Sequence, residues 1–272
     1  MVVFPNAKIN LGLHVLNSRP DGFHDIETVF YPVGLKDLLE ILPAGDERED
    51  FRITGQVVPG DPEDNLCRKA FRMMASDFSI PPVRIHLHKV IPAGSGLGGG
   101  SSDGAYTLKA LSDMFRLGLP EEKLSGYATR MGSDCTFFLH NRPLFGYGRG
   151  DRFEPVAINL SDYRIAVVVP PVNIRTSWAY SVVKPRKPKH FLKEVVTGCP
   201  ESWRTLLVND FEKPVYSKYP FIKEIRDRLY KMGSVYASLS GSGSAVYGIF
   251  RGSVPQPLDF PGCFSWQSDY LA

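Results

Sequence analysis

Residues 92–102 read Pro92-Ala93-Gly94-Ser95-Gly96-Leu97-Gly98-Gly99-Gly100-Ser101-Ser102, which places five glycines in seven positions. Before this stretch, Val83, Ile85 and Leu87 alternate with polar residues, which is the period of a half-buried strand. After it, apolar residues recur at helical spacing, so we expect a helix over residues 101–117. Glycines at such a junction let main-chain amides approach a ligand, and the helix dipole favours negative charge. The stretch therefore predicts a phosphate-binding loop.

Two familiar glycine motifs fit this loop poorly. It is not a P-loop, because no Gly-Lys-Ser/Thr closes it. Gly94, Gly96 and Gly99 match GxGxxG. That match is weak evidence for a dinucleotide fold, because the segment lies far from the N-terminus and does not open a βαβ unit.

A hydrolase is the rival enzyme class. Residues 100–104 match the GxSxG nucleophile elbow around Ser102, with Asp134 and a histidine, His140 or His190, downstream. The elbow needs a strand that runs directly into its first glycine, and here that place is taken by other glycines. We therefore favour the phosphate loop.

Two further polar residues are candidates for chemistry. Asp134 follows a glycine turn and precedes the apolar residues 137–139. It is either a helix cap or a carboxylate held in a partly dry site as a general base. Lys8 lies within a predicted strand, with Asn6 and Asn10 on its own face, so it is either solvated or lines a site.

The remaining pattern predicts a mixed chain of strands and helices. Alternation predicts strands over residues 9–15 and 25–31, joined by turn formers at residues 17–22. Asp64 and Asn65 are the candidate cap of a helix, a second helix is expected to end at Gly233, and a hairpin is expected over residues 236–250. A change of composition near residue 160 predicts two domains, residues 1–159 and 160–272.

Composition and charge limit the function classes. The 272 residues carry 32 Lys and Arg against 29 Asp and Glu, and only residues 184–190 form a short basic run. This is no nucleic-acid footprint, whereas a mild positive excess suits an anionic small-molecule substrate. The apolar runs are too short for a membrane span, and the N-terminus lacks the pattern of a signal peptide. The four cysteines are far apart and suggest reduced thiols in a cytoplasmic protein, with no metal site.

Three motifs, taken in order, resemble those of the GHMP kinase superfamily. They are residues 5–11 at the N-terminus, the glycine loop at residues 92–102, and residues 239–245 near the C-terminus. The segments at residues 19–24 and 132–134 are similar to the branch of that superfamily that acts on a cytidine diphosphate conjugate. The similarity extends over essentially the whole chain and is weakest over residues 183–203.

The resemblance implies an α+β fold of two domains and a role for each motif residue. The N-terminal domain would be ribosomal protein S5 domain 2-like and bind ATP, and the C-terminal domain would be ferredoxin-like. Asp134 would be the catalytic base and Lys8 its charge partner. The residues that would bind ATP are Asn65, Lys89, Pro92, Ala93, Gly94, Ser95, Gly96, Leu97, Gly98, Gly99, Gly100, Ser101, Ser102, Gly241, Ser242 and Gly243. The cytosine would stack between Phe23 and Tyr180, or Trp178 in its place, while His24 and Asn10 would bind the polar parts of the substrate.

The implied reaction is ATP-dependent phosphorylation of a hydroxyl on the cytidine diphosphate conjugate, with Mg²⁺ and with no protein metal ligand assigned. The protein is expected to be a monomer or weak homodimer in the cytoplasm, with no nucleic-acid or membrane partner. Phe23 stands where tyrosine is common in this branch, which keeps the stacking face and loses a hydroxyl. Two alternatives stay open: a kinase of the homoserine or mevalonate type, and a regulator that binds ATP without turnover.

Overall fold

The computed structural model describes residues 1–45 and 48–268. The chain forms two compact units, and each unit is built from separate stretches of sequence. The first unit contains Met1–Ala7, Gly34–Ala93 and Gly98–Arg142, and the second contains Lys8–Val33, Gly94–Leu97 and the chain from Pro143 onward. The division into residues 1–159 and 160–272 stays a prediction.

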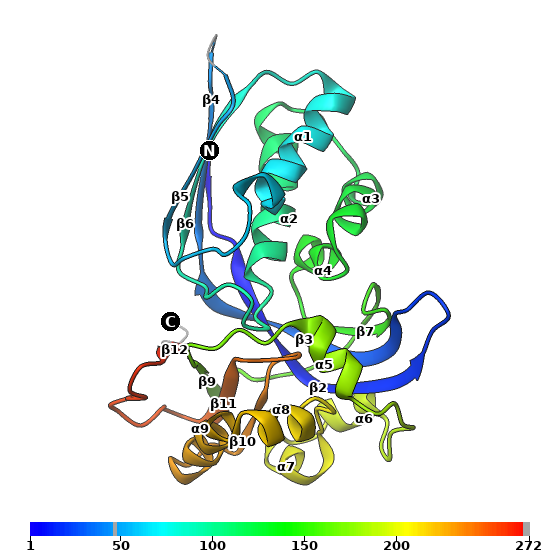
Figure 1. Cartoon of the computed structure of the whole chain (residues 1–272), viewed down its shortest axis with the longest axis vertical. Helices are drawn as coiled ribbons and strands as arrows, with labels where there is room; N and C mark the ends of the chain where they lie inside the picture. Colours follow the sequence, from blue (N-terminus) through cyan, green and yellow to red (C-terminus); the bar gives the residue numbers. More distant parts are fainter. Residues whose placement is uncertain (46–47, 269–272) are drawn as a thin grey trace. The chain divides into compact units, whose positions relative to one another are not determined.

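The first unit is a four-stranded sheet with helices on one face (Figure 1). The strand order is β1 (Val2–Val3), β4 (Leu38–Pro43), β6 (Val83–Lys89) and β5 (Asp50–Gly55), with β5 parallel to β6 and the other pairs antiparallel. The helices are η1 (Pro62–Asp64), α1 (Leu66–Phe78), α2 (Gly99–Met114), α3 (Glu121–Met131) and α4 (Cys135–His140). Val83, Ile85 and Leu87 are buried on β6, as the alternation predicts.

The second unit contains two four-stranded sheets (Figure 1). One has the order β2 (Asn6–Ser18), β3 (His24–Lys36), β7 (Leu144–Gly148) and β8 (Arg152–Pro155). The other has the order β10 (Tyr236–Leu239), β11 (Val246–Arg251), β9 (Tyr163–Val169) and β12 (Phe264–Gln267), with antiparallel pairs throughout. The helices are α5 (Thr176–Val182), α6 (Leu192–Val196), η2 (Pro200–Ser202), α7 (Trp203–Leu206), α8 (Glu212–Lys218) and α9 (Pro220–Lys231).

One hydrophobic core joins the elements of the second unit. Leu13 and Val15 from β2 share it with Val168 from β9, and α9 contributes Ile222 and Leu229. Strand β9 is buried from Arg164 to Val169, so side chains on both of its faces are covered. This explains why its sequence is a continuous apolar run rather than an alternating one.

The predicted elements are present, with one error at the helix after the glycine loop. Strands β2, β3, β6, β10 and β11 and helices α1 and α9 confirm the sequence pattern. Helix α2, however, begins at Gly99, two residues before the predicted start at residue 101. It ends at Met114, three residues before the predicted end at residue 117. It ends early because Phe115 leaves helical geometry and Arg116 has a φ of 52°.

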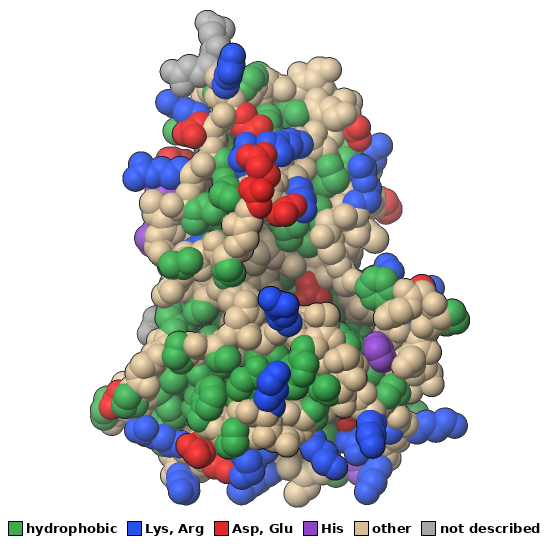
Figure 2. Space-filling model, in the orientation of Figure 1, with side chains coloured by type: hydrophobic (Ala, Val, Ile, Leu, Met, Phe, Trp, Pro, Cys, Tyr) green, Lys and Arg blue, Asp and Glu red, His purple; other side chains and the backbone are tan. Residues whose placement is uncertain are grey.

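Charged side chains are mixed over the surface. On the face that Figure 2 shows, Lys and Arg side chains lie in several places, and Asp and Glu side chains lie between them. Within residues 1–45 and 48–268, none of the helices combines the length and the apolar character that crossing a bilayer requires.

Candidate active site

The middle of the glycine loop packs against its neighbours through backbone atoms. The Gly96 carbonyl oxygen accepts hydrogen bonds from Lys8 Nζ at 3.0 Å and from Ser240 Oγ at 2.9 Å, and the Ser95 carbonyl oxygen accepts one from the Ala245 amide at 2.9 Å. Gly96 has a φ of 84°, and a Cβ there would lie 2.2 Å from the Ser240 carbonyl oxygen. Only glycine therefore fits this position.

The end of the loop opens helix α2 with a left-handed glycine. Gly98 is the N-cap, with φ 72° and ψ 13°, and no side chain caps the helix. The 16-residue helix therefore offers first-turn amides and the positive end of its dipole to an anion. The Ser102 hydroxyl in this turn is buried and has no hydrogen-bond partner among the described residues. These features fit a bound polyphosphate.

This geometry is wrong for a nucleophile elbow. The elbow requires a strand before its first glycine. Gly100 is already the second residue of helix α2, and Ser102 donates its amide to the Gly98 carbonyl oxygen as part of the helix. The hydrolase alternative is therefore excluded.

Lys8 is buried rather than solvated. Its side chain lies on β2 with only 3% of the residue exposed. Lys8 Nζ donates to Asn10 Oδ1 at 2.6 Å and lies 5.3 Å from the centre of the Phe30 ring. Asn10 is fixed in turn, because its Nδ2 donates to Thr28 Oγ1 at 3.0 Å. The polar face of β2 thus holds a buried cation beside the Gly96 carbonyl.

Asp134 lies at the N-cap position of α4 but makes no capping hydrogen bond with its side chain. The observation disfavours the helix-cap interpretation of this residue. The five residues after it, from Cys135 to Leu139, are all buried. Burial raises the pKa of the Cys135 thiol to about 12, and the nearby charge of Asp134 acts in the same direction. The carboxylate therefore lies directly before the buried residues of α4, and its role as a general base stays a prediction.

Lys89 takes part in a buried ion-pair cluster of the first unit. Its Nζ donates to Asp103 Oδ2 on α2 at 2.7 Å and also to Asp37 Oδ2. Asp37 Oδ1 accepts the amides of Val90 at 2.6 Å and Ile91 at 2.9 Å. The cluster joins the end of β6 to the first turns of α2, so it fixes both flanks of the glycine loop. Contact between Lys89 and ATP stays a prediction.

The predicted substrate residues gather in the second unit. The rings of His24 and Tyr180 stack with centroids 5.0 Å apart and planes at 28°. Phe23, the residue before His24 in the sequence, is 53% exposed. Trp178 points elsewhere, since its ring contacts Tyr219 edge to face at 5.9 Å. The structure thus brings Tyr180, and not Trp178, to His24.

The remaining predicted residues lie at the ends of elements. Asn65 caps α1, with its Oδ1 accepting the Cys67 amide at 2.9 Å. Residues 241–243 form the turn between β10 and β11, with Gly241 at φ 57° and Gly243 at φ 90°. Pro92 and Ala93 connect β6 to the loop, and Ser101 lies in the first turn of α2.

Sequence patterns missed several side chains that hold these loops. Buried Asn209 donates from Nδ2 to the carbonyl oxygens of Leu239 and Gly241, both at 2.9 Å, and so fixes the 241–243 turn. Ser240 fixes the glycine loop in the same way, because its Oγ donates to the Gly96 carbonyl oxygen. Asp37 fixes the segment between β6 and the loop, because its Oδ1 accepts the Val90 amide. Each contact spans more than 25 residues of sequence, so no local pattern announces it.

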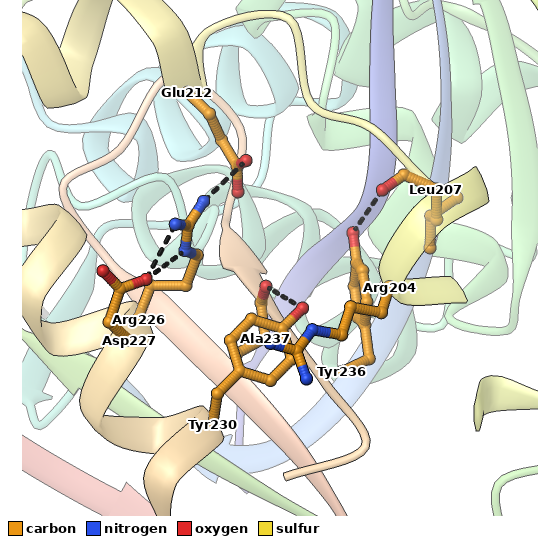
Figure 3. Close-up of a pocket in the computed structure, with 8 residues that line it drawn as sticks. All are labelled: Arg204, Leu207, Glu212, Arg226, Asp227, Tyr230, Tyr236 and Ala237. Atoms are coloured by element: carbon orange, nitrogen blue, oxygen red, sulfur yellow. Dashed lines mark hydrogen bonds and ion pairs between the residues drawn. The ribbon is translucent and has the colours of Figure 1, made fainter. Parts of the chain in front are cut away.

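The second unit has a pocket lined by none of the predicted site residues (Figure 3). Its volume is about 200 Å³, below the range of about 300–1,000 Å³ that is usual for ligand sites. Arg226, one of its two arginines, pairs with Asp227 at 2.7 Å and with Glu212 at 3.5 Å (Figure 3). We therefore do not assign a ligand to it.

The described part of the chain offers no ready-made metal centre. Across residues 1–45 and 48–268, no three His, Cys, Asp or Glu side chains are grouped so that they could hold a metal ion.

Comparison with known proteins agrees with the fold and the loop. The model of the GHMP kinases N terminal domain matches residues 65–142, and that of the GHMP kinases C terminal domain matches residues 191–256. A homoserine kinase structure from Cytophaga hutchinsonii has a TM-score of 0.64 at 16% identity, covering 97% of this chain and 94% of its own. At that identity the likeness shows the fold alone. Both domains of a GHMP kinase are present, as the resemblance implied.

Closer relatives narrow the class. A Bacteroides fragilis protein called 4-diphosphocytidyl-2-C-methyl-D-erythritol kinase is 45% identical over 272 residues, with 99% of each chain covered. A Bacteroides thetaiotaomicron protein of the same name is 46% identical, covering 94% of this chain and 95% of its own. A crystal structure of 4-(cytidine 5'-diphospho)-2C-methyl-D-erythritol kinase is 32% identical with a TM-score of 0.79, covering 93% and 91%. The chain belongs to the GHMP kinases and, within them, to the 4-diphosphocytidyl-2-C-methyl-D-erythritol kinase family.

Proposed function

We propose that the protein transfers the γ-phosphate of ATP to the 2-hydroxyl of 4-diphosphocytidyl-2-C-methyl-D-erythritol. The products are the 2-phosphate and ADP, in the non-mevalonate pathway of isoprenoid precursors. The observation that carries the substrate assignment is a run of two aromatic residues at the start of β3: Phe23, which is 53% exposed, and His24, whose ring stacks on Tyr180. Aromatic faces grouped in this way suit a pyrimidine base. The names of the relatives support the same assignment.

In this proposal Asp134 accepts the proton of the 2-hydroxyl as its oxygen attacks the γ-phosphorus. The bond from that phosphorus to the bridging oxygen breaks, and ADP leaves. Lys8 stabilises the negative charge that develops on the attacking oxygen. Its burial strengthens this effect, because a cation acts more strongly where water is excluded. The two residues therefore have distinct roles, proton acceptor and charge stabiliser.

The phosphates of ATP would bind to the amides of the 94–100 loop and the N-terminus of α2. Phosphoryl transfer depends mainly on positioning and charge stabilisation, which such a cradle supplies. Mg²⁺, bound through the phosphate oxygens, would neutralise their charge. Asn65, Lys89 and the 241–243 turn would complete the nucleotide site.

The base would lie on Phe23 and Tyr180. The imidazole of His24 covers one face of the Tyr180 ring in this structure. Cytosine would therefore stack on the other face of Tyr180, or on the first face once His24 has moved off it. A ring nitrogen of His24 would then bind the polar edge of the base, and Asn10 would bind the methylerythritol group.

Replacement of the base tests this mechanism. Asp134→Asn should lower kcat by about 10² to 10⁴-fold while leaving the Kd for ATP within about threefold, because only proton acceptance is lost. Asp113→Asn, an exposed position on α2, is the matched control. Steady-state kinetics and calorimetric ATP titration measure the two quantities. A near-normal kcat in Asp134→Asn would show that another group takes the proton.

The two alternatives predict different outcomes. A homoserine or mevalonate kinase has no use for a pyrimidine site, so cytidine should then not bind. A regulator without turnover would bind ATP and transfer nothing. We further propose that the enzyme acts in the cytoplasm as a monomer or weak homodimer, without nucleic-acid or membrane partners.

A further inference from the structure

The turn between β7 and β8 lies beside the predicted base site. In the sheet, Ile26 of β3 pairs with Gly148 of β7, so the residues after Gly148 lie next to the start of β3. Gly148 and Gly150 have φ values of 68° and 82°, which allow a tight turn with Arg149 at its tip. No motif marks this turn, and only the strand register brings it to Phe23 and His24.

Arg149 covers one face of the Phe23 ring. Its guanidinium carbon lies 4.7 Å from the centre of the ring. Asp151 holds the arginine, since its two carboxylate oxygens accept the Arg149 amide at 3.2 Å and Nε at 3.4 Å. A guanidinium that lies flat on an aromatic face is attracted by the ring quadrupole. Arg149 is thus held by hydrogen bonds to Asp151, while its guanidinium packs on the Phe23 ring.

Phe23 needs such a support because the hairpin tip leaves it exposed. Its amide is fixed by Asp21 Oδ1 at 3.1 Å, but 53% of the residue is open to solvent. The other cation of the tip, Arg19, is engaged by Asp21 at 3.2 Å and Asp25 at 2.9 Å. Among the described residues, Arg149 is the one whose side chain lies over a face of the Phe23 ring.

We propose that Arg149 is a positioning residue for the pyrimidine. By covering one face of Phe23 and fixing the plane of the ring, it leaves the opposite face ready to stack on the base. The local ion pairs favour this role over direct binding of the substrate's diphosphate, because Arg19 is paired with Asp21 and Asp25, and Arg149 is paired with Asp151. This inference rests on the proposed function, since it assigns a role within the same substrate site.

Binding of cytidine and of CDP to the full-length protein tests the proposal. Arg149→Leu should weaken both ligands by the same factor, about 3- to 10-fold, because the base is their common part. It should raise KM for the substrate and leave kcat unchanged, and Arg149→Lys should restore part of the affinity. Arg152→Leu, an exposed arginine on the neighbouring strand, is the control.

A double-mutant cycle separates positioning from other effects. In a Phe23→Leu background, Arg149→Leu should weaken cytidine binding no further, because the ring through which Arg149 acts is gone. Additive losses would overturn the proposal, as would a loss confined to CDP, which would indicate phosphate binding. If the unaltered protein binds ATP but neither cytidine nor CDP, the proposed substrate fails and this inference with it. If it binds cytidine and Arg149→Leu has no effect, this inference alone fails.

Discussion

At the scale of single residues, we expect substitution in the buried cluster around Lys89 to lower the free energy of unfolding strongly. The Lys89 ammonium lies between the carboxyl groups of Asp37 and Asp103, and the Lys89 side chain is 3% exposed. Lys89→Met would leave Asp37 and Asp103 buried side by side without a cation. We expect the free energy of unfolding to fall by about 3–5 kcal/mol. Urea denaturation measures it, and Lys36→Met, on an exposed part of β3, should change it by less than about 1 kcal/mol.

Asp103 should make stability depend on pH. Burial raises the pKa of its carboxyl to about 8, against the attraction of Lys89 and with the repulsion of Asp37. In the unfolded chain the pKa is about 4. Between these values the folded state binds more protons, so the free energy of unfolding falls as pH rises from about 4 to about 8.

Asp103→Asn removes this dependence and keeps an oxygen that can accept from Lys89. Relative to the unaltered protein, the variant should therefore be more stable at pH 8 than at pH 5. Denaturation curves at both pH values give the difference. An equal difference at pH 5 and pH 8 would show that Asp103 is already ionised throughout this range.

Residues were predictable from the sequence where local pattern marks them. Asp134 and Lys8 stand out because a charged side chain interrupts an apolar segment or a strand, and their burial could not be read from that pattern. Asp37 and Arg149 were not predictable. Asp37 reaches Lys89 across 52 residues, and Arg149 reaches Phe23 only through the β3 and β7 register.

At the scale of elements, the glycine loop is where one methyl group should matter most. In Gly96→Ala the new Cβ would meet the Ser240 carbonyl oxygen at 2.2 Å, so the loop must move. We expect KM for ATP to rise by about 10- to 100-fold, since displaced phosphates are poorly aligned for transfer. Steady-state kinetics with varied ATP measure this effect.

Gly126→Ala is the matched control for that change. Gly126 lies inside α3, and a Cβ there would meet nothing within 4 Å. Kinetics should be unchanged and stability should rise by about 0.5–1 kcal/mol, because alanine favours a helix. A normal KM in Gly96→Ala would mean that the loop tolerates the displacement and does not cradle the phosphates.

Element boundaries were less predictable than the elements themselves. The strand, the loop and the helix around residues 83–114 follow from hydrophobic period alone. The start of α2 does not, because its N-cap is a left-handed glycine rather than the Ser, Thr, Asp or Asn that sequence rules seek. Because the first helical residues are glycines, the sequence pattern did not predict that the helix begins at Gly99.

At the scale of the whole molecule, the order of the motifs indicated the family, whereas the two compact units follow no local sequence pattern. Each compact unit is made of separate stretches of the chain, and the stretches of the two units alternate along the sequence. The glycine loop itself is divided, with Gly94–Leu97 in one unit and Gly98 onward in the other. No shift of composition can mark such boundaries, because the chain crosses them within single motifs.

The account depends most directly on the acceptor of the phosphate. The decisive measurement is transfer of labelled γ-phosphate from ATP to 4-diphosphocytidyl-2-C-methyl-D-erythritol by the purified protein, with homoserine and mevalonate assayed alongside. We predict labelled product from the cytidine conjugate alone. Transfer to homoserine or mevalonate with none to the conjugate would contradict the substrate assignment, and ATP binding without transfer to any of the three would contradict the kinase itself.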